Sequence, residues 1–169
     1  MTSAREGAGP ELLGIYLNDH LAGATLGVEL AHRMARSHTG PGAGSTMERL
    51  AAEIAQDRSA LQEFMAGLGI PARVYKVCAG WIGEKVGRLK LNGRLRSRSP
   101  LSNLEELEML RLGVEGKAAG WRTLRVLADS DPRLDSARLD SLMSRARSQA
   151  DLLEELRVRA AAEVIAVPG

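Results

Sequence analysis

Cysteine and aromatic residues are scarce in this sequence of 169 residues, and each scarcity excludes a class of protein. The single cysteine, Cys78, excludes an intrachain disulfide framework. Its apolar neighbours Val77 and Ala79 favour a core residue over a nucleophile. Two Trp, two Tyr and one Phe are too few for binding that relies on stacking nucleic-acid bases.

Long apolar runs and an excess of one charge are also missing. Lys and Arg number 23 against 21 Asp and Glu, a net charge of +2 that argues against nucleic acid as the main partner of the whole chain. No apolar run approaches the roughly 18 residues of a membrane span. Residues 1–10 lack a basic start followed by an apolar stretch, so we expect a cytoplasmic protein.

Motifs of common enzyme families are not found. The sequence has no phosphate-binding P-loop, dinucleotide fingerprint, serine nucleophile elbow or zinc-ligand spacing. These absences favour a protein that is not an enzyme.

Alternating β-branched runs are missing too, and apolar residues instead recur at spacings of three and four. The pattern predicts an all-α protein. A chain of this length suits one domain that buries about 70% of its unfolded surface. We expect a disordered segment at 1–10, one helical bundle domain at 11–166, and a short tail at 167–169.

The first half of the chain predicts two long helices, at 11–37 and 46–68. Gly and Pro at 39–44 separate them, and Ser45 with Glu48 forms a capping box. Gly69 and Pro71 should end the second helix. The inward face of the first consists of Leu13, Leu17, His20, Ala24, Gly27, Val28 and Ala31, and that of the second of Leu50, Ile54, Leu61, Met65 and Leu68.

The second half predicts a connecting segment and two more long helices. An amphipathic helix at 74–91 and a basic stretch to Arg98 form the connection. Ser102 with Glu105 caps a helix that ends near Ala128, and the last helix runs over 134–166. Their inward faces consist of Leu107, Leu110, Gly113, Val114, Lys117 and Trp121, then of Leu139, Leu142, Ala146, Gln149, Leu153, Leu156 and Ala160. Four long helices with a long central connection predict an up-down bundle with one crossover, which contains an extra helix.

Two short motifs carry a resemblance to a known family. The sequence Glu53-Ile54-Ala55-Gln56, followed by Leu68-Gly69-Ile70-Pro71, is similar to the second helix of bacterioferritins. The chain thus resembles the ferritin-like superfamily, in which Glu and Glu-x-x-His residues from four helices bind two irons.

The resemblance also implies that most di-iron ligands have been replaced. Gln56 stands at a ligand His and His20 at a ligand Glu, while Gly113, Ala146 and Gln149 take three further ligand positions. Only Glu53 is kept. The resemblance therefore implies a bundle without a working di-iron centre, which we expect to be a homodimer with a structural or partner-binding role.

A single metal ion is the alternative. Helical periodicity turns Asp57 inward at least as well as Gln56. His20, Glu53 and Asp57, with Gln149 nearby, would then hold one iron or other divalent ion for oxidase or storage chemistry.

The amine of Lys117 could instead fill the space that a metal ion would occupy. It lies on the inward face one turn after Gly113, so its amine would pair with Glu53 or Asp57 where relatives hold iron. His20 and Gln149 would be hydrogen-bond partners, completing a buried polar network. The competing interpretation is that Lys117 extends to the surface along its aliphatic stem.

Three glycines in one predicted helix, Gly113, Gly116 and Gly120, cost about 1 kcal/mol each relative to Ala. They indicate either close helix packing, which we favour, or room for a bound molecule. Glu29 and His32 have the spacing of a metal pair but face away from the apolar stripe, so we expect a solvated surface.

A basic strip at 85–98 includes the end of the predicted connecting helix and could bind an anionic partner such as phosphate or a lipid surface. The alternative is a solvated strip whose positive charges balance the acidic residues at 105–108. The strip consists of Lys85, Arg88, Lys90, Arg94, Arg96 and Arg98.

Overall fold

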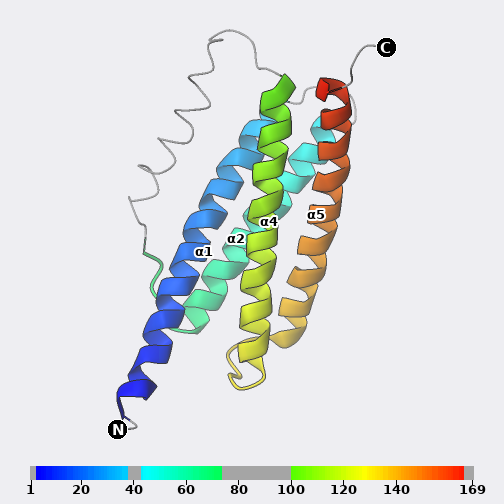
Figure 1. The fold of residues 1–169 in the computed structure, drawn as a ribbon. Coiled ribbons are helices and arrows are strands. Elements are labelled where there is room, and N and C mark those ends of the chain that lie inside the picture. Colours follow the sequence, from blue (N-terminus) through cyan, green and yellow to red (C-terminus); the bar gives the residue numbers. More distant parts are fainter. Residues whose placement is uncertain (1–2, 38–42, 74–99, 166–169) are drawn as a thin grey trace.

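The computed structural model describes residues 3–37, 43–73 and 100–165, and the remaining residues lie outside this description. The described residues form four helices and no strand: α1 (Ser3–Ser37), α2 (Ala43–Gly67), α4 (Pro100–Ala128) and α5 (Ser136–Ile165) (Figure 1). The predicted all-α class is therefore confirmed. None of these helices is long and apolar enough to span a membrane.

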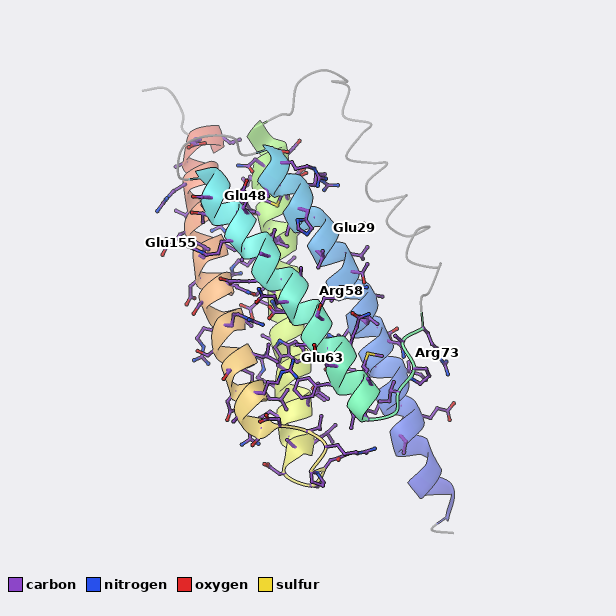
Figure 2. The ribbon with its side chains drawn as sticks, turned by 180° about the vertical axis from the view of Figure 1, so that it is seen from behind. Glu29, Glu48, Arg58, Glu63, Arg73 and Glu155 are labelled. Atoms are coloured by element: carbon purple, nitrogen blue, oxygen red, sulfur yellow. The ribbon has the colours of Figure 1, made fainter. Side chains whose placement is uncertain are left out.

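The helices form a bundle of two antiparallel pairs. α1 packs against α2, α4 packs against α5, and α1 also contacts α4. Figure 2 views the bundle from behind, with α2 between α1 and α5. Consequently α2 and α4 face each other diagonally, and polar residues on either helix can meet at the centre.

The connection between the two pairs lies largely outside the described residues. α2 ends and α4 begins at opposite ends of the bundle (Figure 1). The predicted helix at 74–91, Cys78 and the six residues of the basic strip all fall within 74–99, which the structure does not describe.

The end of α2 follows the sequence prediction. Gly69 has a positive φ of 73°, the conformation that glycine adopts without strain. Its amide donates to the Ala66 carbonyl, and the Ile70 amide donates to the Met65 carbonyl at 2.8 Å, which is a Schellman motif. The turn directs the chain back toward α1, where Asn18 bonds the Pro71 carbonyl and the Arg73 amide.

Helix starts differ from the predictions by a few residues. Ser45 and Ser102 lie in the first turns of α2 and α4 rather than at their caps, and Pro100 occupies the first position of α4, where its missing amide costs nothing. α5 begins after Asp135, whose carboxylate accepts from the Arg138 amide at 3.0 Å. α1 begins at Ser3, so residues 3–10, expected to be disordered, are helical, although they include Gly7, Gly9 and Pro10.

The core follows the predicted faces of α2 and α5 closely. All five predicted α2 positions are buried, and of the α5 set only Leu156 is half-buried. On α4, Leu107, Leu110, Val114 and Trp121 are buried, whereas Gly113 is exposed. On α1 the predicted residues Leu13, His20, Ala24, Gly27 and Val28 are only half-buried. Three of them, His20, Ala24 and Gly27, line an open side of the bundle.

Candidate functional site

A buried carboxylate lies at the centre of the bundle. Asp57 on α2 is 1% exposed, and both of its oxygens accept hydrogen bonds from charged groups. Its Oδ2 accepts from Lys117 Nζ at 2.5 Å and from Gln149 Nε2 at 3.2 Å, while its Oδ1 accepts from Arg145 Nη2. The desolvation cost of this carboxylate is thus offset by two cations and an amide.

Gln149 connects the remaining members of the network. The side chain is 2% exposed, and its Oε1 accepts from Lys117 Nζ at 2.5 Å. Its Nε2 also donates to Glu53 Oε2 at 3.1 Å. The amide therefore bridges the lysine and the second carboxylate without adding charge.

Helical spacing explains why these side chains converge. Glu53 and Asp57 are four residues apart on α2, and Arg145 and Gln149 are four apart on α5, so each pair shares one helix face. Lys117 comes from α4, on the far side of the core. The network, defined as Glu53, Asp57, Lys117, Arg145 and Gln149, combines two acids with two bases and is neutral overall.

Burial lowers the pKa of the Lys117 amine below its ordinary value, because desolvation disfavours the ammonium form. The charge and hydrogen bond of Asp57 oppose that effect. The side chain is 12% exposed, so the amine is held inside the bundle rather than extended into solvent.

The structure brings together four of the five residues expected in the buried network: Glu53, Asp57, Lys117 and Gln149. Gln56, placed by the resemblance at a ligand position, is exposed, and its Oε1 lies 3.4 Å from Arg145 Nη1. Gly113 also faces solvent, while Ala146 is an apolar core residue.

Arg145 is the member that sequence reasoning missed. It flanks the apolar stripe of α5 instead of lying on it, so periodicity assigns it to the surface. Its long side chain reaches Asp57 from this position while remaining partly exposed. The four-residue spacing to Gln149 is the signal that could have indicated it.

His20, expected in the network, lies elsewhere. Its ring packs edge-on against Tyr16 with 4.5 Å between ring centroids, and it also packs against Gly120 of α4. A Cβ at Gly120 would lie 3.1 Å from His20 Nδ1, so only glycine leaves full room for the ring. Burial lowers the pKa of His20, against an opposing effect of Asp19.

A cleft between α1 and α4 lies beside the network. Its volume is about 610 Å³, and its walls are mainly apolar. Asp57 and Lys117 contribute to its lining, as do His20 and Trp121. Five glycines also line it: Gly23, Gly27, Gly113, Gly116 and Gly120.

Other charged residues lie outside the network. Glu29 and His32 are both exposed, as predicted. Within the predicted acidic stretch at 105–108, Glu106 lies 3.3 Å from Arg33, and Glu108 lies 3.8 Å from Arg157. These contacts tie α4 to α1 and α5.

The donor set does not fit a di-iron centre. The network contributes two carboxylates, and an ammonium and a guanidinium already bond Asp57. Within the described part of the chain, no group of three or more His, Cys, Asp or Glu side chains is arranged to hold a metal ion. No protein-family model, curated protein or solved structure matches this chain.

Proposed function

We propose that this protein is a ferritin-like helical bundle that works without a di-iron centre, as a structural or partner-binding module. The observation that carries the proposal is the Lys117 amine, which donates to Asp57 and Gln149 inside the core. An internal ammonium thus supplies the positive charge that metal ions supply in di-iron bundles.

Charge balance supports this proposal. Two irons need several carboxylates to offset their charge. The network has two carboxylates and two protein cations, so adding metal ions would leave a large excess of positive charge. The site could accept two irons only if Lys117 and Arg145 moved away from Asp57.

A single-metal site is the second candidate function. The convergence of Glu53, Asp57 and Gln149 favours it, since their oxygens lie within one hydrogen-bond network. Against it, Lys117 bonds the same Asp57 and Gln149 oxygens that a metal would need, and the imidazole of His20 packs against Tyr16 instead.

Metal analysis separates the two candidates. Protein purified without chelators is expected to contain no stoichiometric metal by plasma mass spectrometry. Anaerobic titration with ferrous iron followed by oxygen should give no oxo-bridged absorption. Two tightly bound irons per chain would overturn the proposal, and one bound ion per chain would favour the single-metal candidate.

The variant Lys117→Met sharpens this experiment. Loss of the ammonium removes one donor from Asp57 Oδ2 and the lysine donor from Gln149 Oε1, so we expect the variant to gain measurable affinity for a divalent ion. Arg122→Met is the matched control, because Arg122 is an exposed cation on the same helix. Equal metal binding by both variants would show that Lys117 does not occupy a metal position.

A partner-binding role, with homodimerisation as the proposed form, is supported by exposed apolar side chains on α4. Met109 is 45% exposed and Leu112 is 69% exposed, and they lie one turn apart. Sedimentation equilibrium should show a dimer that Leu112→Glu weakens. A monomer at all accessible concentrations would contradict the proposed homodimer.

A further inference from the structure

Part of the cleft between α1 and α4 is open space beside α4 glycines that make no close contact with another helix. A Cβ built at Gly113 or Gly116 meets no atom within 4 Å, whereas one at Gly120 meets the His20 ring. Close packing therefore accounts for Gly120 alone among these three. The other two keep the cleft open, at a cost in helix stability that a bound molecule would offset.

Two residues that line this cleft carry hydrogen-bond donors with capacity to spare. The Lys117 ammonium has three protons, and in the described part of the chain it donates to two acceptors, Asp57 and Gln149. Trp121 is 2% exposed, and its indole N–H has no acceptor among the described residues. An unpaired buried donor is costly, so a ligand oxygen that accepts from either group would be stabilising.

The charge of the network indicates the charge of the ligand. At the buried base of the cleft Asp57 and Lys117 pair with each other, so neither charge is left for an ionic ligand to neutralise. The other charged lining residues, Asp19, Glu29 and Arg33, are exposed at its rim. An ion at this base would lose its hydration without a free counter-charge there. An uncharged molecule avoids this cost.

We propose that the α1–α4 cleft binds an uncharged, mainly apolar small molecule whose carbonyl-type oxygen accepts a hydrogen bond from Lys117 or Trp121. The volume of about 610 Å³ is that of an ordinary small-molecule site. The inference goes beyond the proposed metal-free scaffold, because ligand binding is measured independently of metal content.

Three dyes test the ligand chemistry on the full chain. Prodan is an uncharged naphthalene ketone whose emission moves to shorter wavelength in dry surroundings. Dimethylaminonaphthalene lacks the ketone, and anilinonaphthalene sulfonate carries a negative charge. Prodan should bind with micromolar affinity. Dimethylaminonaphthalene lacks the hydrogen-bond acceptor and the sulfonate dye adds a charge, so each should bind about tenfold more weakly or worse.

Variants test the location. Gly113→Leu and Gly116→Leu each place a side chain in the open part of the cleft and should weaken prodan binding about tenfold or more. Leucine is a better helix former than glycine, so both should fold, which circular dichroism checks. Val126→Leu is the control, because Val126 is exposed on α4 and does not line the cleft.

The Trp121 indole proton supplies an independent readout. The chain has two tryptophans, so a proton–nitrogen spectrum has two indole signals, and Trp81→Phe assigns them. Prodan should move the Trp121 signal downfield, and dimethylaminonaphthalene should not.

Three outcomes would overturn the inference. Wild-type protein could fail to bind prodan up to its solubility, or Gly113→Leu and Gly116→Leu could bind it as tightly as wild type. The sulfonate dye could bind as well as prodan. Absence of prodan binding together with a dimer that Gly113→Leu dissociates would assign the cleft to a second copy of the chain instead.

Discussion

The Lys117 amine lies 2.5 Å from Asp57 Oδ2, which joins α4 to α2 across the diagonal of the bundle. These helices belong to different antiparallel pairs, so this ion pair ties the two halves of the molecule together. Gln149 of α5 bonds both groups and fixes their relative position.

Replacing Lys117 with Met should lower the free energy of unfolding by about 3–5 kcal/mol, because it leaves buried carboxylate charge with one cation fewer. Urea denaturation measures the loss. Arg122→Met, on the exposed face of α4, should change the stability by less than about 0.5 kcal/mol. A Lys117→Met variant that melts within a few degrees of the parent would contradict the assigned role.

The two carboxylates should differ in importance. Asp57→Asn removes the negative charge that bonds both Lys117 and Arg145, so we expect a loss of about 3–5 kcal/mol. Glu53 is half-buried and accepts from the neutral Gln149 amide, so Glu53→Gln should cost about 1 kcal/mol. Equal losses in denaturant titrations would show that the network is not centred on Asp57.

The glycines of α4 should respond oppositely to alanine. Gly116→Ala should stabilise the protein by about 0.5–1 kcal/mol, since its Cβ meets open space. Gly120→Ala should destabilise it, because the methyl group would lie 3.1 Å from His20 Nδ1. In a double-mutant cycle, His20→Ala should restore most of the Gly120→Ala loss, and additive losses would exclude this contact.

His20 should make stability depend on pH in mildly acidic solution. Burial lowers its pKa in the folded state below 6.5, while the unfolded chain keeps the ordinary value. Between these two values the unfolded state binds more protons, so the free energy of unfolding should decrease as the pH falls below 6.5. His20→Phe keeps a ring against Tyr16 but cannot titrate, so it should lack this dependence in thermal melts from pH 5 to pH 7.

The sequence by itself determined which faces of α2 and α5 turn inward. Residues three and four apart share a face whatever the helix packs against, so Leu50, Ile54 and Leu61 on α2, and Leu153 on α5, could be assigned to the core from local pattern alone. The same rule placed Asp57 and Lys117 inside. Gly69 ended α2 because a positive φ is a property of the residue and its local turn.

Only the tertiary structure decided which inward residues meet. The distance between side chains on different helices depends on how far each helix is rotated and shifted along its neighbour, and no local spacing encodes that. His20 and Lys117 were both predicted to face inward. For this reason they nevertheless have different partners: His20 contacts the Tyr16 ring, and Lys117 pairs with Asp57. The same offset brings Arg145 from the edge of α5 into the network, and it sets Gly120 against a ring while Gly116 faces an open cleft.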